Sequence, residues 1–548
     1  MVVIKKDPTP QQIKILEENG NCAVIASPGS GKTFTISRKI GDIVSTLPWY
    51  KGIIAISYTN KASDELKHRA LKMSSDVKNS FFGTIDSFFV GEIIMPFMRQ
   101  MFGNATTEIK FVKIAESAFF EEFGTALEVM EQSKSLTQDD FNTLRTLYLT
   151  GEIILELFGK LALYLLKINP SVSLYLRSRF THIFIDEYQD CGWDQHRFFI
   201  ECVELGIIGV AVGDLNQSIY AFSKKDPAYL NSLTTNGSFK TYPLDVNHRC
   251  HKSIANYATK FLNPTVIGLP TVDEIRVFLR ELDGDEKQIG EWISDAIPRI
   301  QKKFGIENNS DFAILSRNNA SLARVRQHIT QDTFLPEETP LDKYNIKWCL
   351  FFKRLITYLL NGDISALDLL EDYLSNDDNG VFFSRLCSEL LLLKNQIALD
   401  PQNLVTYLDQ LVSFAVQILP NDKSKKAVEQ LQQTVSTEIY LSSFIPPNKD
   451  QVQLMTLHKS KGLEFRVVFH LDLYDWVMPG FKWMKEQDQK ELVQDKNLHY
   501  VGITRAKDIV IFCVGNKRYN AKNQQQDGKR SQFLGQNHLL GYFKSIKS

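Results

Sequence analysis

Two adjacent carboxylates, Asp186 and Glu187, stand directly after an apolar run at 183–185. Such a run predicts a buried strand that ends at the carboxyl edge of a parallel sheet, where open α/β sheets bind their ligands. At that edge Asp186 could hold Mg²⁺ and Glu187 could polarise an attacking water. Alone, the pair could also be an ordinary strand end with solvated acids. Gln189 and Asp190 just beyond are not needed for metal binding, so they indicate coupling to something else.

A glycine-rich loop lies far upstream, between an apolar run at 23–25 and a helical pattern that begins at Phe34. Strand, loop and helix in this order are typical of a phosphate-binding P-loop, whose backbone N–H groups close around phosphate oxygens. Lys32 would reach the β- and γ-phosphates of ATP, and Thr33 would ligate Mg²⁺. The residues expected to contact the nucleotide are Ser27, Pro28, Gly29, Ser30, Gly31, Lys32, Thr33 and Phe34, with Gln12 placed upstream to read the adenine edge.

These two features predict a nucleotide hydrolase but leave its kind open, because kinases, ABC proteins and helicases share both. The chain has 548 residues, which is long enough for roughly three or four domains. Its formal net charge is −1, so any nucleic-acid contact must use local basic patches rather than a global field.

Seven cysteines are scattered along the chain without a C-x-x-C pair. This pattern argues against a disulfide framework or a zinc site and favours the reducing cytoplasm. No uncharged apolar run approaches the roughly 18 residues that a membrane span needs. We therefore expect a soluble, cytoplasmic protein with no membrane partner.

Seven segments resemble, in the same order, the motifs of the UvrD/Rep/PcrA group of superfamily 1 DNA helicases. They lie at 56–62, 82–88, 186–190, 212–220, 244–249, 452–465 and 500–506. The resemblance spans positions 9 to 507 and implies an enzyme that hydrolyses ATP with Mg²⁺ and moves 3′ to 5′ on single-stranded DNA. It also implies the fold class, which is α/β with two RecA-like P-loop NTPase domains on parallel sheets, each with a helical insertion.

The same resemblance predicts how the domains are ordered along the chain. The expected ranges are 1–90 with 173–240 for the first RecA-like domain, 91–172 for its insertion, 241–355 with 450–548 for the second RecA-like domain, and 356–449 for its insertion. The second insertion is short and acidic, and an acidic module is a poor phosphate binder. It could contact a protein instead, or it could simply present a solvated helical face.

Catalytic roles follow from the matched motifs. The catalytic residues would be Lys32, Asp186, Glu187, Gln217, Arg249 and Arg505, with Mg²⁺ held by Thr33 and Asp186. Gln217 would sense the γ-phosphate, and Arg249 and Arg505 would act as arginine fingers from the second sheet. An arginine finger is worth roughly 10³–10⁵ in rate. His248 stands where the family has a stacking tyrosine, and Glu464 matches its ribose contact.

Ten residues match family positions that contact DNA: Tyr58, Thr59, Asn60, Thr84, Ser87, Tyr220, Phe222, Arg317, Thr456 and His458. Stacking of bases on the three aromatic members would contribute about 1–3 kcal/mol per base. Taken alone, any one of these aromatic rings, or a lone histidine, more often belongs to a core. The sequence departs from the family at Ser223, where an arginine is usual. We therefore expect weaker coupling of ATP hydrolysis to DNA than in a repair helicase.

Finer features resemble the helicase-like subunits of Gabija anti-phage defence systems. They are the segments 82–104 and 339–342, Tyr188, and Asp86 at a position where the family usually has histidine. This resemblance implies a hetero-oligomer with a GajA-like nuclease of the OLD family. The chain would then sense single-stranded DNA or DNA ends and license that nuclease. Two other interpretations stay open: a stand-alone repair or recombination helicase, and a nucleotide-gated DNA-binding subunit that signals without processive unwinding.

Overall fold

The computed structural model describes most of the chain. The described residues are 7–74, 76–107, 109–218, 225–344, 346–361, 364–371, 373–374, 380–398, 401–420, 422–520 and 522–546. Two predicted DNA contacts, Tyr220 and Phe222, and the departure at Ser223 lie outside them. The contacts within the chain define two compact units. The first holds 1–277, 475–508 and 531–544, and the second holds 278–474, 509–530 and 545–548.

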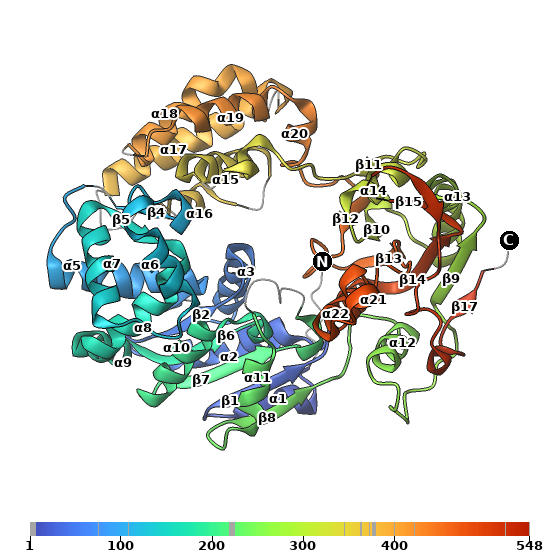
Figure 1. Cartoon of the computed structure of the whole chain (residues 1–548), viewed down its shortest axis with the longest axis horizontal. Coiled ribbons are helices and arrows are strands. Elements are labelled where there is room, and N and C mark those ends of the chain that lie inside the picture. Colours follow the sequence, from blue (N-terminus) through green and yellow to red (C-terminus); the bar gives the residue numbers. More distant parts are fainter. Residues whose placement is uncertain are drawn as a thin grey trace. The chain divides into compact units, whose positions relative to one another are not determined.

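A six-stranded parallel sheet forms the centre of the first unit, with the strand order β3-β2-β6-β7-β1-β8 (Figure 1). The strands are β1 (Cys22–Ala26), β2 (Gly52–Ile56), β3 (Phe81–Gly83), β6 (Phe180–Ile185), β7 (Ile208–Gly213) and β8 (Lys240–Leu244). Because β8 belongs to this sheet, the sheet extends four residues past the domain boundary at 240 that the sequence suggested.

Helices cover both faces of this sheet, which is why its inner strands β1, β2 and β7 are apolar throughout. Along β6, Ile183 and Ile185 pack into one core while Phe184 packs into the other. One core is closed by α1 (Pro10–Glu17), α2 (Lys32–Thr46) and α3 (Asn60–Leu71). The other is closed by α10 (Trp193–Glu204), α11 (Ala228–Thr235) and the helical insertion. The strand ends are thereby fixed on both sides.

The helical insertion of the first unit lies between β3 and β6. It comprises α4 (Ile85–Phe88), η1 (Phe89–Ile94), α5 (Met95–Phe102), η2 (Ile114–Glu116), α6 (Phe120–Gln132), α7 (Gln138–Thr150), η3 (Leu155–Leu157), α8 (Phe158–Ile168) and α9 (Pro170–Arg179), with a small parallel pair of β4 (Lys110–Val112) and β5 (Glu152–Ile154). Its apolar side chains join the same core as one face of the sheet. The insertion therefore packs as part of this unit.

The second sheet has seven strands in the order β11-β12-β10-β13-β14-β9-β17. They are β9 (Val277–Leu282), β10 (Phe312–Ser316), β11 (Thr333–Phe334), β12 (Val452–Thr456), β13 (Phe465–His470), β14 (Ala506–Gly515) and β17 (Lys544–Ser545). The central strand β10 pairs in parallel with β12 and with β13. The expectation of an α/β fold with two RecA-like parallel sheets is confirmed.

The remaining helices and one β-hairpin complete the two units. The second unit holds α13 (Glu286–Phe304), α14 (Asn319–Arg326), the hairpin of β15 (Lys517–Tyr519) and β16 (Gln525–Asp527), and a helical group of α15 (Lys347–Leu360), α16 (Ala366–Glu371), α17 (Gly380–Ile397), α18 (Leu408–Ile418), α19 (Lys425–Val435) and α20 (Glu438–Ser442). That helical group has a core of its own. By contrast, α12 (Lys252–Leu262), α21 (Phe481–Glu486) and α22 (Gln489–Thr504) pack in the first unit.

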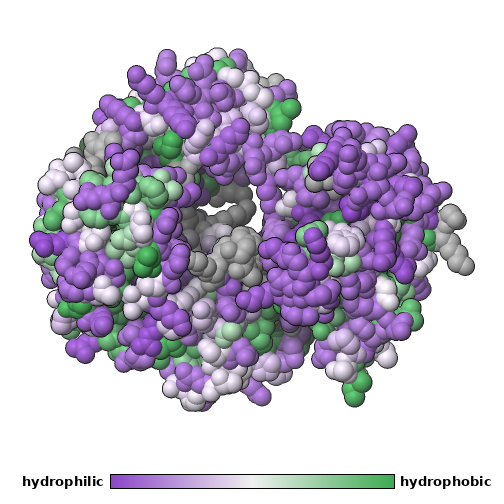
Figure 2. All heavy atoms as spheres, viewed as in Figure 1, coloured by the Kyte–Doolittle hydropathy of each residue, from purple (hydrophilic) through white to green (hydrophobic). Residues whose placement is uncertain are grey.

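Hydrophilic residues cover most of the face seen in Figure 2, and hydrophobic ones are scattered over it. Within the described part of the chain, none of the helices has both the length and the apolar character that crossing a bilayer requires.

Candidate functional site

The loop between β1 and α2 has the geometry of a phosphate cradle. Gly29 and Gly31 have φ angles of 68° and 83°, in the left-handed region that favours glycine. The space around both glycines is also limited. A Cβ added at Gly29 would lie 2.5 Å from Cβ of Arg249, and one at Gly31 would lie 2.7 Å from Nε2 of Gln12. The loop ends at the N-terminus of α2, where the first turn presents N–H groups and the positive end of the helix dipole.

Helix α1 contacts this loop through the side chain of Gln12. Thr9 and Gln12 form a capping box at its N-terminus, and Nε2 of Gln12 donates to the carbonyl oxygen of Ser30 at 3.3 Å. Gln12 is only 4% exposed. The structure thus places this predicted adenine contact against the P-loop backbone, with both ends of its carboxamide bonded within the protein. Its role toward adenine stays a prediction.

A buried lysine that the sequence interpretation missed closes the other end of α1. Nζ of Lys39, on α2, donates to the carbonyl oxygens of Ile15 at 3.0 Å and Leu16 at 3.2 Å, and also to that of Glu18. Burial lowers the pKa of Lys39. Since its ammonium ties α1 to α2, it helps to hold Gln12 against the loop. The available signal was a lysine inside the apolar stripe of a helix.

The two acids lie at the carboxyl end of β6, as their sequence position predicts. The backbone N–H of Asp186 donates to the carbonyl oxygen of Ile56 on β2, and Oδ1 of Asp186 accepts from the N–H of Glu187 at 2.9 Å. Glu187 has a φ of 53°, an unusual backbone conformation for a non-glycine residue. Its Oε1 lies 3.0 Å from Nζ of Lys32, so the P-loop lysine and the second acid form an ion pair.

Gln189 connects this pair to the next strand. Its Nε2 donates to Oε2 of Glu187, and its Oε1 accepts from the N–H of Asp214 at 2.9 Å. Gln189 is fully buried, with 0% exposure. A Cβ at Gly213 would lie 2.4 Å from Oε1 of Gln189, so glycine in β7 leaves room for the contact. The chain of contacts runs from Lys32 through Glu187 and Gln189 to Asp214.

Several charged side chains lie close together at the carboxyl edge of the first sheet. Burial works against the ammonium of Lys32, but the carboxylates of Glu187, Asp186 and Asp214 raise its pKa above the ordinary value. Hydroxyl and carboxylate oxygens are the ligands that Mg²⁺ prefers, so Thr33 at the start of α2 and Asp186 have suitable chemistry to hold it. The residues present fit a magnesium–nucleotide complex.

Asp214 organises the turn that follows β7. Its Oδ1 accepts from the N–H of Asn216 at 2.9 Å, and its carbonyl oxygen accepts from the N–H of Gln217 at 3.0 Å. This places Gln217 in η5 (Leu215–Gln217), where it is buried. Nδ2 of Asn497, on α22, donates to the carbonyl oxygen of Ser218 at 2.9 Å. Helix α22 is therefore fixed to the turn that carries the predicted γ-phosphate sensor.

Arg505 is the C-cap of α22 and is 1% exposed. Its Nε donates to the carbonyl oxygen of Val501 at 3.1 Å, and its Nη2 donates to Oγ1 of Thr504 at 3.3 Å. Burial and the nearby guanidinium of Arg249 lower the pKa of Arg505 to about 10, while Glu187 and Asp214 act in the opposite direction. The two predicted arginine fingers are thus close enough to repel each other, and a bound anion would relieve that repulsion.

The segment that follows β8 holds Arg249 against the P-loop. The N–H of His248 donates to the carbonyl oxygen of Gly29 at 2.8 Å, and the ring of His248 is exposed. Oδ1 of Asn247 accepts from the N–H groups of Arg249 and Cys250, both at 2.8 Å. The sequence interpretation missed Asn247, and it placed Arg249 on the second sheet. In the structure Arg249 instead follows the edge strand of the first sheet.

The predicted strand contacts of the first unit lie beside the acids. A cavity of about 280 Å³ at the ends of β2, β3 and β6 is lined by Tyr58, Thr84, Asp186 and Glu187, among others. Tyr58 is 41% exposed. Nζ of Lys225, which also lines the cavity, lies 3.8 Å from the centre of the Tyr58 ring. The residues predicted to hydrolyse ATP and those predicted to contact a strand therefore line one cavity.

Two other residues predicted to contact DNA are the N-caps of helices. Thr59 caps α3, which begins at Asn60, and Oγ1 of Thr59 accepts from the N–H of Ala62 at 3.2 Å. Thr84 caps α4, and its Oγ1 lies 2.8 Å from Oγ of Ser87. Both hydroxyls hold their own helices in this structure.

The remaining predicted residues lie in the second unit. Ser316 at the end of β10 is the register partner of Thr456 at the end of β12, so Arg317, Thr456 and His458 gather at one edge of the second sheet. Burial and then the charge of Arg317 lower the pKa of His458 to about 4. Glu464, the predicted ribose contact, stands before β13, at the opposite edge.

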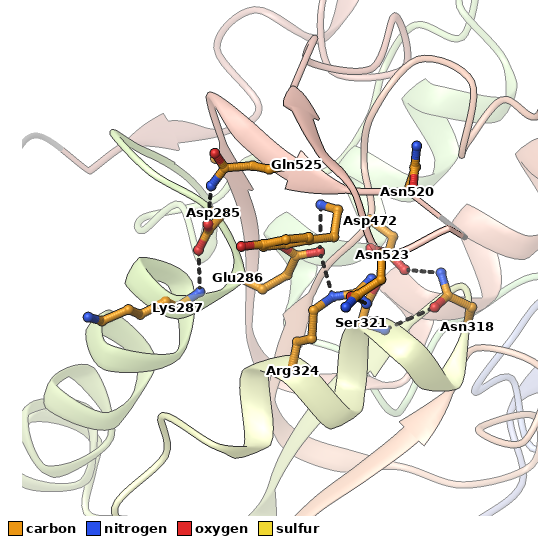
Figure 3. A network of polar contacts seen from close by, with 12 residues as sticks. Asp285, Glu286, Lys287, Asn318, Ser321, Arg324, Asp472, Asn520, Asn523 and Gln525 are labelled. Carbon is orange, nitrogen blue, oxygen red and sulfur yellow. Dashed lines mark hydrogen bonds and ion pairs between the residues drawn. The ribbon is translucent and has the colours of Figure 1, made fainter.

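Asp472 supports the loop of Arg317. Its Oδ2 accepts from Oγ of Ser316 at 2.6 Å and from the backbone N–H of Arg317 and Nδ2 of Asn318, both at 3.1 Å. Asp472 is buried and has a φ of 60°. Figure 3 shows its carboxyl beside Asn318, within a polar network that includes Glu286 and Arg324. This support was not predictable from a motif.

A P-loop, an acid pair at the neighbouring strand end and two RecA-like sheets define a nucleotide hydrolase of the helicase class. Two family models match the chain. The UvrD/REP helicase N-terminal domain matches residues 8–101 and 112–237, and the UvrD-like helicase C-terminal domain matches residues 375–516. The chain belongs to the UvrD/Rep-type helicases, a family that binds ATP and DNA.

Several curated proteins are similar over nearly the whole chain. Gabija protein GajB of Bacillus cereus (strain VD045) is 28% identical, over 92% of this chain and 95% of its own length. The ATP-dependent DNA helicase Rep of Buchnera aphidicola subsp. Schizaphis graminum is 24% identical, over 92% and 93%. The ATP-dependent DNA helicase PcrA of Staphylococcus epidermidis is 22% identical, over 97% and 86%.

Proposed function

We propose that this protein is a DNA-dependent ATPase of the UvrD type that acts as a GajB-type DNA-sensing subunit and activates a partner nuclease. The observation that carries the first part is the shared cavity. Tyr58 and Thr84 line the same space as Asp186 and Glu187. A strand bound there would lie against the residues that act on ATP, so binding of one substrate can alter the geometry for the other.

In this proposal Lys32 and the loop N–H groups hold the phosphates, while Thr33 and Asp186 hold Mg²⁺. The ion would neutralise charge on the phosphates during transfer. Lys32 must exchange Glu187 for phosphate when ATP binds, which frees Glu187 to orient the attacking water. Gln189 keeps one oxygen of Glu187 fixed during that exchange. Arg249 and Arg505 would stabilise the charge that develops on the γ-phosphate.

The strand-dependent part is tested by measuring ATP hydrolysis with and without oligo(dT). We expect stimulation by the oligonucleotide in the wild type. Tyr58→Ala should raise the oligonucleotide concentration needed for half-stimulation by roughly 5- to 150-fold, since one stacked base is worth about 1–3 kcal/mol. Tyr50→Ala is the matched control, because Tyr50 is also exposed, at 51%, but lies outside the cavity. Equal loss in both variants, or no stimulation of the wild type, would contradict the proposal.

The defence part rests on the similarity to GajB and is tested separately. We expect the chain to co-purify with a GajA-like nuclease of the OLD family, and to protect cells from phage only when both are expressed. Lys32→Ala should abolish protection while complex formation is retained. Failure to form the complex would remove the partner claim and leave the ATPase claim intact.

A stand-alone repair or recombination helicase is the second candidate, because Rep and PcrA match at almost the same coverage. Strand separation on a 3′-tailed duplex without any partner would favour it. ATP turnover without strand separation would instead favour a nucleotide-gated signalling subunit.

A further inference from the structure

A second cavity lies in the first unit on the side of α10 that meets the helical insertion. It has a volume of about 430 Å³ and is lined by residues of α8, of α10 and of the connection between α6 and α7. Its principal lining residues are Lys134, Lys160, Tyr164, Lys167, Trp193 and Arg197. None of them belongs to the nucleotide site or to the strand contacts described above.

The lining of this cavity is basic. It holds four cationic side chains and one acid, Glu201. Arg197 is paired with Glu201 at 2.5 Å, and Lys160 is paired with Asp194 at 3.2 Å. Lys134 and Lys167 are exposed and form no ion pair with any residue that the structure describes. Two ammonium groups are therefore available to an anionic ligand.

The indole ring of Trp193 lies beside these cations and is held by its own contacts. Nε1 of Trp193 donates to the carbonyl oxygen of Lys134 at 3.4 Å, and Nζ of Lys134 lies 5.2 Å from the centre of the indole ring. The ring also packs against Tyr229, with the ring centres 6.2 Å apart. An immobilised indole beside lysines can stack a planar base while the lysines contact a phosphate.

An acidic region separates this cavity from the strand contacts. A neighbouring cavity of about 360 Å³ shares Lys160 and Trp193 with it, and reaches Asp86 and Lys225 beside Tyr58. That intervening space is lined by Asp86, Glu131, Glu156 and Asp194, against two lysines. Four carboxylates would repel a continuous phosphate backbone. The basic cavity is therefore poorly placed to extend the strand path and well placed to hold a separate ligand.

We propose that the basic cavity binds one nucleotide, with its base stacked on Trp193 and its phosphate held by Lys134 and Lys167. The ligand class is a nucleoside monophosphate, either free or at the phosphorylated end of a DNA strand. The volume lies in the usual range for small-ligand sites, roughly 300–1,000 Å³. Trp193 is the first residue of α10, which follows Asp190 after Cys191 and Gly192. An occupant would thus contact the helix that directly continues the catalytic acid segment.

The test uses the full chain and thymidine 5′-monophosphate in equilibrium dialysis, with a non-hydrolysable ATP analogue and Mg²⁺ present. A monophosphate lacks the β- and γ-phosphates that the P-loop holds, so we expect one saturable site that the analogue does not displace. Lys134→Glu with Lys167→Glu should weaken binding by roughly tenfold or more. The matched control is Lys14→Glu with Lys72→Glu, which reverses two exposed charges elsewhere in the same unit and should leave binding unchanged.

Two further measurements test the contact with the base and identify the source of the nucleotide. Trp193→Phe should retain binding and Trp193→Ala should lose most of it. Displacement of the monophosphate by a 5′-phosphorylated oligonucleotide, but not by its 5′-hydroxyl form, identifies a strand end as the source, and no displacement by either identifies the free nucleotide. Absence of saturable binding, displacement by the ATP analogue, or equal affinity in the Lys134/Lys167 double variant would each overturn the proposal.

Discussion

Gln189 connects Glu187, which follows β6, to Asp214, which follows β7. Replacing it with leucine keeps a similar volume but removes the donor to Glu187 and the acceptor for the N–H of Asp214. A hydrogen bond to a charged group is worth about 1.5–3 kcal/mol, and each 1.36 kcal/mol is tenfold in rate. If that bond holds Glu187 in its working position, kcat for ATP should fall by roughly 10- to 150-fold in Gln189→Leu.

The same geometry predicts what should stay constant. Among the contacts described, Gln189 touches neither the P-loop nor Tyr58, so KM for ATP and the affinity for oligo(dT) should change less than about threefold. The assay is steady-state ATP hydrolysis at saturating oligo(dT), with strand affinity measured by fluorescence anisotropy. Thermal unfolding of each variant confirms that the protein is folded at the assay temperature.

A second substitution separates positioning of Glu187 from support of the turn at Asp214. Gln189→Glu keeps an oxygen that can accept from the N–H of Asp214 but places a carboxylate where the donor to Glu187 was. We expect its turnover to stay low. Recovery of wild-type turnover in Gln189→Glu, or a kcat within twofold of wild type in Gln189→Leu, would refute the reasoning.

Three further outcomes follow from the structure. Gly31→Ala should weaken ATP binding by at least about tenfold, because a φ of 83° is strained for alanine and the added methyl group would lie 2.7 Å from Nε2 of Gln12, which would have to shift. An ATP titration with unchanged affinity would argue against this cradle. Asp472→Ala removes one acceptor from three donors, so oligo(dT) affinity should fall by roughly tenfold while turnover without DNA is retained, as anisotropy and ATP hydrolysis can check. Burial lowers the pKa of four histidines to about 4: His182, His196, His458 and His470. In the unfolded chain these histidines bind protons from about pH 6.5 downward, whereas in the folded protein they do so only near pH 4, so the free energy of unfolding should fall as pH drops from 6.5 to 4. Urea unfolding between pH 7.5 and 5.5 with an unchanged midpoint would contradict this assignment.

Local signals in the sequence predicted the elements that carry the phosphate cradle and the acids. The apolar run before Ala26, the glycines and the helical pattern after Lys32 are adjacent in the chain, so no tertiary information was needed to place them. The same holds for Asp186 and Glu187, because a buried parallel strand reads as a continuous apolar run.

The contacts that couple these elements were not predictable from the sequence alone. The bond from Asp214 to Gln189 exists because β6 and β7 are neighbours, and the contact of His248 with Gly29 exists because β8 pairs with β1. Strand order is a property of the folded sheet. Lys39 shows a further limit, since a lysine in a helix is usually solvated and only the packing of α1 against α2 buries it.

The central claim is that hydrolysis of ATP occurs at Glu187, in the cavity that also binds the DNA strand. Single-turnover hydrolysis by Glu187→Gln, at saturating oligo(dT) and Mg²⁺, tests it most directly. We predict that the variant binds ATP and oligo(dT) with affinities close to wild type and hydrolyses ATP at least about 100-fold more slowly, as expected when a general base is lost. Turnover at the wild-type rate in Glu187→Gln would contradict the account.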